Sequence, residues 1–290
     1  MLDKVLIHEQ LKTRLRGFIT SDTHALLISG PKGAGKGFLM QVLAAEILGT
    51  DLAKLSNNRG FVHIKPQANS IGIDDIRELK RSSRLKTTGK AKIRRVILVE
   101  NAEQMTDEAQ NAFLKLLEEP PEDTVILLTE NGESQLRDTV YSRLQRVKHL
   151  PLSKKTTTDY FLQKKLGAHE IERVYHLTGG KIGLMYSLLA EDTDNVLVDQ
   201  VRLAKELLAA ASYERMLRID EIARNKENLV MLLFALRQVC LAALNSAATT
   251  SNEKQMKLWH KRAKLIFKTE QAANLNPNSK LLLTNLFLGL

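Results

Sequence analysis

Residues Gly30 to Gly37 read GPKGAGKG, a phosphate-binding loop without its last functional residue. The general pattern is G-x-x-x-x-G-K-[S/T], and Gly30, Gly35 and Lys36 supply its glycines and its lysine. The final position normally offers a hydroxyl group to Mg²⁺, whereas Gly37 has no side chain. We therefore expect the loop to keep the shape of a phosphate site and to lack part of its metal site.

The loop lies between a strand pattern and a helix pattern, which is the context that this motif requires. The apolar run 24–29 predicts a buried strand, and 38–48 has helical spacing. Backbone N–H groups of the loop, including those of Gly33 and Gly35, would then face a phosphate group at a helix N-terminus. Lys36 would contact the β- and γ-phosphates. A tight strand-to-helix turn without a ligand is the alternative.

A second departure occurs about sixty residues later, where the apolar run Val96–Val99 ends in Glu100 and Asn101. An ATPase with this loop normally carries there an aspartate that holds the metal and then an acidic residue that activates water. Glu100 can still reach Mg²⁺, but its extra methylene displaces the carboxylate. The neutral amide of Asn101 cannot accept a proton from water. We expect ATP and Mg²⁺ to bind weakly or not at all here, and hydrolysis to be very slow or absent.

Strand and helix patterns alternate through the first half of the chain. Apolar runs predict strands at 24–29, 61–64, 95–99, 124–129 and 147–150. Helix patterns separate them, and one of these, Asp107–Leu117, ends before Pro120 and Pro121. Such alternation predicts an α/β domain whose parallel sheet has helices on both faces.

Beyond about Pro151 the pattern is helical. Glycines at 167 and 179–180 interrupt short helices, and longer helices follow from about Asp194, including one predicted over Tyr213–Asn225. We therefore predict three domains: a nucleotide-binding-type domain at 1–151, a small helical lid at 152–193 and an all-helical domain at 194–290.

The chain carries a net charge of +10 over 290 residues, and its basic residues are clustered. Lys80–Arg95 holds eight basic residues and no acidic one, and Lys254–Lys268 holds six and no acidic one. Such clusters favour binding to nucleic acid or to an acidic protein surface. A solvated helix face with a basic loop is the alternative.

Cysteine usage and hydropathy indicate a cytoplasmic protein without a membrane partner. Cys240 is the only cysteine, so no internal disulfide can form. Charged residues interrupt the apolar stretches before the roughly 18 residues that a membrane span needs. Residues 1–18 lack the apolar core and the cleavage site of a signal peptide.

Further motifs follow the loop in order: SIGID at 70–74, E-x-A-E-x-M at 100–105, N-A-x-L-K-x-L-E-E-P-P at 111–121, LLTEN at 127–131 and T-x-x-S-R at 139–143. Together they resemble the AAA+ clamp-loader family of bacterial DNA polymerase III over at least Val5–Leu150, and more loosely to the C-terminal end. Gly37 and Asn101 make the chain most similar to the family's delta-prime subunits, relatives of the tau/gamma motor subunit with a degraded ATPase site.

The resemblance implies an AAA+ P-loop domain, a helical lid and an all-α C-terminal collar that holds an oligomer together. It implies tau/gamma and delta subunits, the sliding clamp and primer-template DNA as partners. Ser142 and Arg143 match the family's serine-arginine motif, in which the arginine reaches the ATP site of a neighbouring subunit; Leu144 replaces the motif's cysteine. Arg143 would thus be an arginine finger supplied in trans. A structural ion pair is the alternative.

Three departures from the family pattern affect site residues. The relatives' four-cysteine zinc module has no cysteine here, so no zinc or other metal is expected. The lid lacks the sensor arginine, since Ile182 stands in its place, and Lys181 is at best a partial substitute. At the end of the 124–129 strand, Asn131 or Thr129 could orient water, although a plain strand end is the alternative.

The resemblance also suggests residues that contact DNA. Lys115 and the cluster at 80–95, including Arg84, Lys86 and Lys90, are candidates for contacts to phosphate that read no sequence. For Lys115 the alternative is a surface ion pair with Glu119.

Three functions are compatible with the sequence. The first is a regulatory clamp-loader subunit with little or no ATPase activity of its own. The second is an active motor subunit, or another AAA+ ATPase, that tolerates these site residues. The third is a stand-alone nucleic-acid-binding protein that acts through its basic face.

Overall fold

The computed structural model describes residues 1–67, 70–83, 93–132, 136–189, 196–273 and 278–290. The chain divides into two compact units, Met1–Leu152 and Ser153–Leu290. The first unit has the predicted α/β architecture, and the described part of the second is helical. The further division of the second unit at residues 193 and 194 stays a prediction.

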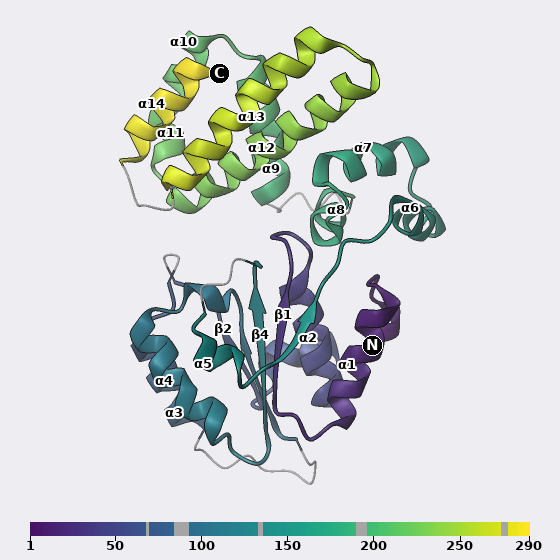
Figure 1. The fold of residues 1–290 in the computed structure, drawn as a ribbon, viewed down its shortest axis with the longest axis vertical. Coiled ribbons are helices and arrows are strands. Elements are labelled where there is room, and N and C mark those ends of the chain that lie inside the picture. Colours follow the sequence, from purple (N-terminus) through teal and green to yellow (C-terminus); the bar gives the residue numbers. More distant parts are fainter. Residues whose placement is uncertain (68–69, 84–92, 133–135, 190–195, 274–277) are drawn as a thin grey trace. The chain divides into compact units, whose positions relative to one another are not determined.

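A parallel sheet forms the centre of the first unit (Figure 1). Within the described residues it has five strands in the order β2-β3-β4-β1-β5. Their bounds are β1 Ala25–Ser29, β2 Phe61–Ile64, β3 Arg95–Val99, β4 Thr124–Glu130 and β5 Gln145–Lys148. The predicted sheet is confirmed, but the prediction for the last strand, 147–150, was wrong by two residues. Strand β5 pairs with β1, and the ladder between them ends where Lys148 lies opposite Ser29.

Alternate residues of the strands enter two separate cores, as the period of two in a strand requires. Leu26 and Ile28 of β1 face the core that contains α1 (Glu9–Thr20) and α2 (Lys36–Ile47). Leu27 faces the opposite core, which contains α3 (Ile73–Ser83), α4 (Asp107–Glu118) and the short α5 (Asp138–Tyr141). Figure 1 shows the two helical layers on either side of the sheet.

The register of the strands brings several polar residues to one edge of the sheet. Ser29 of β1 lies opposite Glu130 of β4 and Lys148 of β5, while Val99 of β3 lies opposite Leu128. The phosphate loop, Glu100 and Asn131 follow directly after these strands. Ligands of open parallel sheets bind at this carboxyl edge.

The second unit consists of packed helices, and those from residue 196 onward share one apolar core. Its helices are α6 Lys154–Gln163, α7 Ala168–Thr178, α8 Ile182–Leu189, α9 Val196–Ala209, α10 Ser212–Leu217, α11 Ile219–Ala223, α12 Lys226–Thr249, α13 Glu253–Ala273 and α14 Ser279–Gly289. The prediction of one helix over Tyr213–Asn225 was wrong, because the chain forms α10 and α11 there. The buried guanidinium of Arg215 donates to the carbonyls of Leu207, Ala210 and Phe287, which fixes α10 against the ends of α9 and α14.

Helix α12 contains a long apolar stretch, 228–249, in which Arg237 is the one charged residue. Its segment Asn228–Thr249 is long and apolar enough to cross a membrane by length and composition alone. In the second unit, however, Leu232, Leu233 and Leu236 of α12 are buried in the shared core. Arg237 of the same helix pairs with Glu270 of α13 at 2.8 Å. The apolar composition of α12 therefore has an explanation in the packing of this unit.

Candidate functional site

The phosphate loop is folded around its own lysine. Gly33 and Gly35 have φ values of 85° and 87°, in the left-handed region that glycine adopts most readily. Lys36, the first residue of α2, is only 5% exposed. Its ammonium group donates to the carbonyls of Gly30 and Pro31, each at 3.0 Å. It also donates to Oδ1 of Asn131 at 3.0 Å. In this arrangement the protein's own oxygens hold the charge that the motif provides for a phosphate.

The position of the missing hydroxyl is filled by the carboxylate of Glu100, the residue that follows β3. A Cβ atom added to Gly37 would lie 2.6 Å from Oε1 and 2.9 Å from Cδ of Glu100. The carboxylate is held there by Nε2 of His63 at 2.9 Å and by Nε2 of Gln41 at 3.4 Å. Burial opposes ionisation of Glu100, but the hydrogen bond and charge of His63, followed by Lys65 and Gln41, lower its pKa below the usual value.

This corner of the site does not fit a Mg²⁺ ion held in the manner of a phosphate-loop ATPase. Such an ion takes a hydroxyl from the loop and a carboxylate from the strand, in a demanding octahedral geometry. Here the hydroxyl is missing, and the carboxylate of Glu100 occupies its space and is bonded to His63. No hydrolytic step can be derived for this site.

The position that normally activates water is part of a closed hydrogen-bond network. Asn101 has φ 51°, which asparagine tolerates better than most side chains. Its backbone N–H donates to Oγ1 of Thr129 at 2.9 Å, and its Oδ1 accepts from Nδ2 of Asn131 at 3.2 Å. Because Lys36 can only donate, Oδ1 of Asn131 must face it, and the amide nitrogen must face Asn101. Asn131 thus connects Lys36 to Asn101.

Glu103 is a site residue that our sequence analysis missed. Its Oε1 accepts from Nδ2 of Asn131 at 2.5 Å. Its Oε2 is buried without a hydrogen-bond partner among the described atoms. Burial raises the pKa of this carboxyl above its usual value, although hydrogen bonds and the charge of Lys36 oppose the shift. The only available signal was its place as the second glutamate of the E-x-A-E-x-M motif.

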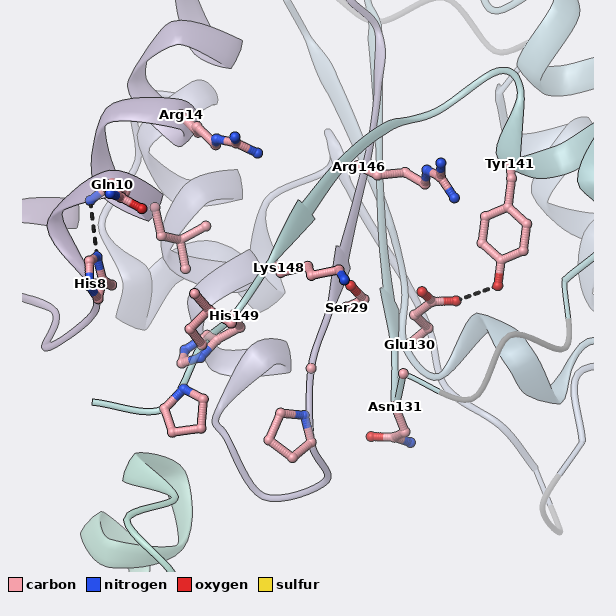
Figure 2. A pocket seen from close by; sticks show the side chains of 16 residues that line it. His8, Gln10, Arg14, Ser29, Glu130, Asn131, Tyr141, Arg146, Lys148 and His149 are labelled. Atoms are coloured by element: carbon pink, nitrogen blue, oxygen red, sulfur yellow. Dashed lines mark hydrogen bonds between the residues drawn. The ribbon is translucent and has the colours of Figure 1, made fainter. Parts of the chain in front are cut away.

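A cavity of about 950 Å³ lies beside the loop (Figure 2). Its lining includes Arg14 of α1 and both Arg146 and Lys148 of β5. His149 also lines it, is 4% exposed and has a buried Nδ1 atom without a hydrogen-bond partner among the described atoms. Burial and then the charge of Lys36 lower the pKa of His149. The sequence analysis named none of these four residues, because their pattern carries no motif.

Arg143 and Ser142 lie at the end of α5, at the surface of the first unit. The Arg143 guanidinium pairs with Glu118 of α4 at 2.8 Å, and its side chain is 36% exposed. It also donates to the Thr139 carbonyl at 2.7 Å and to Oγ of Ser142 at 3.1 Å. The structural ion pair that we considered is therefore present. It is also accessible to solvent.

The remaining predicted residues lie on α4 of the first unit, in the second unit or outside the described residues. Lys115 is exposed on α4, and within the described part of the chain it makes no ion pair with Glu119. Lys181 lies 5.3 Å from the centre of the Phe234 ring in the second unit, and burial followed by the charge of Arg237 lowers its pKa. Arg84, Lys86 and Lys90 lie outside the described residues. Among described side chains, no cluster of three or more histidine, cysteine or acidic groups is arranged to hold a metal.

Known proteins share both the sequence pattern and the fold. DNA polymerase III subunit delta' of Bacillus subtilis is 27% identical over 71% of this chain and 61% of its own length. Replication factor C small subunit 2 of Pyrobaculum islandicum is 31% identical over 61% of this chain and 56% of its own length. The chain thus spans less than two thirds of either relative. The crystal structure of a DNA polymerase III gamma subunit-related protein of Thermotoga maritima covers 97% of this chain, and this chain covers 98% of it, with a TM-score of 0.57 and 23% identity.

A family model described as DNA polymerase III, delta subunit, matches residues 7–153. This match covers just over half of the chain and includes the loop, Glu100, Asn131 and Arg143. The chain therefore belongs to the DNA polymerase III delta-subunit family of AAA+ clamp-loader proteins.

Proposed function

We propose that this chain is a delta-prime-like subunit of a DNA polymerase III clamp loader and that its own nucleotide site does not hydrolyse ATP. The observation that carries the proposal is the position of the Glu100 carboxylate beside Gly37, where a metal-binding hydroxyl would stand. Asn101 supports it, since a neutral amide replaces the group that would accept a proton.

The active contribution of the chain would be Arg143, supplied to the ATP site of a neighbouring subunit. Its guanidinium is partly exposed, and exposed ion pairs such as that with Glu118 contribute little stability. Exchanging this carboxylate for a phosphate would therefore cost little. Ser142 donates to the Thr139 carbonyl and accepts from Arg143, so its role would be to position the arginine.

The proposed partners follow from the family. They are tau/gamma and delta subunits, the sliding clamp and primer-template DNA, all met in the cytoplasm. The helical second unit would hold the subunit in the oligomer as a collar. Lys115 is exposed, as a contact to DNA phosphates requires.

Turnover of ATP by the isolated chain tests the proposal against an active motor subunit. We expect no turnover above background with Mg²⁺, and no change in Lys36→Ala. Measurable turnover that Lys36→Ala abolishes would establish the motor instead. The triple variant Gly37→Thr/Glu100→Asp/Asn101→Glu, which restores the usual residue types, serves as the positive comparison for nucleotide binding in the presence of Mg²⁺.

Assembly tests the proposal against a stand-alone nucleic-acid-binding protein. The chain should co-purify in stoichiometric amounts with tau/gamma and delta subunits from the same organism. A chain that binds DNA but joins no such complex would contradict the proposed function.

A further inference from the structure

One helix of the second unit carries a row of lysines along one side. Lys254, Lys257, Lys261, Lys264 and Lys268 all belong to α13, and all five side chains are exposed. Their spacing alternates between three and four residues. At 3.6 residues per turn they fall within an arc of about 80° and extend along about 21 Å of the helix. We call these five residues the lysine row.

The lysine row lies away from the core of its own unit. Helix α13 packs against α12, beside which it runs in Figure 1. Ile266 and Thr269 are the buried residues of α13. By helical geometry Ile266 lies about 160° around the helix from the middle of the row. Packing against α12 therefore accounts for the apolar residues of α13, but it does not account for the five lysines on the other side.

The row also lacks the carboxylate partners that several other exposed cations of this unit have. Arg202 pairs with Asp199, Arg218 with Glu206, and Lys280 with Asp220. In the row, Lys257 approaches Glu253 at 4.0 Å. For the other four lysines, no ion pair forms with any described residue. Because like charges three and four residues apart weaken a helix, this pattern costs α13 stability unless an anion binds.

We propose that the lysine row binds the sugar-phosphate backbone of double-stranded DNA without reading its sequence. About 21 Å of duplex carries roughly six phosphates on each strand, so a straight row of five lysines is close to the number of phosphates along one strand. Lysine binds phosphate as a flexible point charge, which suits contacts that read no sequence. The exposed aromatic side chains of α13, His260 and Phe267, lie about 80° and 100° around the helix from the middle of the row, so the row itself offers no ring on which single-stranded DNA could stack.

Binding of a labelled random-sequence duplex to the full chain tests this proposal. The test variant changes Lys254, Lys261, Lys264 and Lys268 to Gln. A matched control changes four exposed lysines outside α13, Lys4, Lys54, Lys155 and Lys205, to Gln. Between about 50 and 200 mM salt, we expect the test variant to lose about three to four units of slope in log K against log salt, and at least tenfold in affinity. The control should lose less than one unit.

Two outcomes would overturn the proposal. Equal losses in both variants would show that binding reflects net charge alone. Absence of duplex binding by the unaltered chain, together with row-dependent binding of a polyglutamate peptide, would identify an acidic protein as the partner. The thermal midpoint of the test variant should be unchanged or higher, because repulsion is removed. If that variant does not fold, the Lys→Arg version at the same four positions must retain duplex binding. The proposal does not depend on the function proposed above.

Discussion

The strand-end corner formed by Gly37, Glu100 and His63 and the surface edge around Arg143 belong to one unit, yet they hold their charges differently. In the corner, the Glu100 side chain is 19% exposed and bonded to His63 and Gln41. At the edge, Arg143 is 36% exposed and pairs with the still more exposed Glu118. Breaking a buried charged contact leaves groups unsatisfied, whereas an exposed pair exchanges partners at little cost. The comparison supports the proposal that this chain acts through its surface edge.

The largest expected effect tests the edge. Arg143→Ala should leave the fold intact and lower the ATPase activity at the neighbouring subunit's site by roughly 10³-fold or more, as loss of such a finger does in other phosphoryl-transfer enzymes. The measurement is DNA-stimulated ATP turnover by the reconstituted loader. Arg137→Ala is the matched control, because Arg137 is exposed nearby and pairs with Asp107 at 3.1 Å. Equal turnover in the Arg143 and Arg137 variants would eliminate the finger.

The next effect tests how tightly the corner is filled. Gly37→Ala places a Cβ atom 2.6 Å from the Glu100 carboxylate, which must move and weaken its bond to His63, so the free energy of unfolding should fall by about 1 kcal/mol. Gly17→Ala, also within a helix, meets nothing within 4 Å and should raise it by about 0.5 to 1 kcal/mol. Denaturant unfolding measures both. If the two substitutions shift stability in the same direction, the corner is looser than the contacts indicate.

These two tests concern regions that the sequence predicted unequally well. The order of strands and helices follows from apolar periodicity, and the sheet is as predicted except at β5, whose end depends on where β1 stops. Gly37 and Asn101 mark the altered site, because each residue type removes a group that the chemistry needs. The position of the Glu100 carboxylate depends on His63, a residue from another strand that no local pattern connects to it.

Two other site residues show the same limit. The pKa values of Glu103 and His149 are shifted mainly by burial. Burial depends on packing across the whole unit and not on the residues next to them in the sequence. The ion pair between Arg143 and Glu118 joins two elements 25 residues apart in the sequence. The sequence analysis could name a finger and an ion pair as alternatives, but only the folded chain shows that the contact is present and solvent-accessible.

A smaller effect concerns how the free energy of unfolding depends on pH through Glu100 and Glu103. The lowered pKa of Glu100 adds stability that is present above its unfolded pKa of about 4.5 and lost as pH falls through the folded value. The raised pKa of Glu103 has the opposite sign, so its contribution is present below that value and lost as pH rises through the folded pKa. Glu100→Gln should cost on the order of 1 kcal/mol at pH 7 and less in acid. Relative to Glu103→Gln, the unaltered chain should lose stability as pH rises. The measurement is the free energy of chemical unfolding as a function of pH for the unaltered chain and both variants. If the three curves run parallel, the environments assigned to Glu100 and Glu103 are wrong.

The smallest effect is expected where the edge meets solvent. Glu118→Gln removes the acidic partner of Arg143 and should change the free energy of unfolding by no more than about 0.5 kcal/mol, because both side chains are more than a third exposed. Loader turnover should stay the same or rise, since the guanidinium keeps its bonds to Thr139 and Ser142 and no longer has to leave a carboxylate. A loss of turnover comparable to that of Arg143→Ala would mean that Glu118 itself orients the finger. The ion pair between Arg143 and Glu118 would then be part of the active arrangement. In that case the edge would hold its charges in fixed contacts, as the corner does.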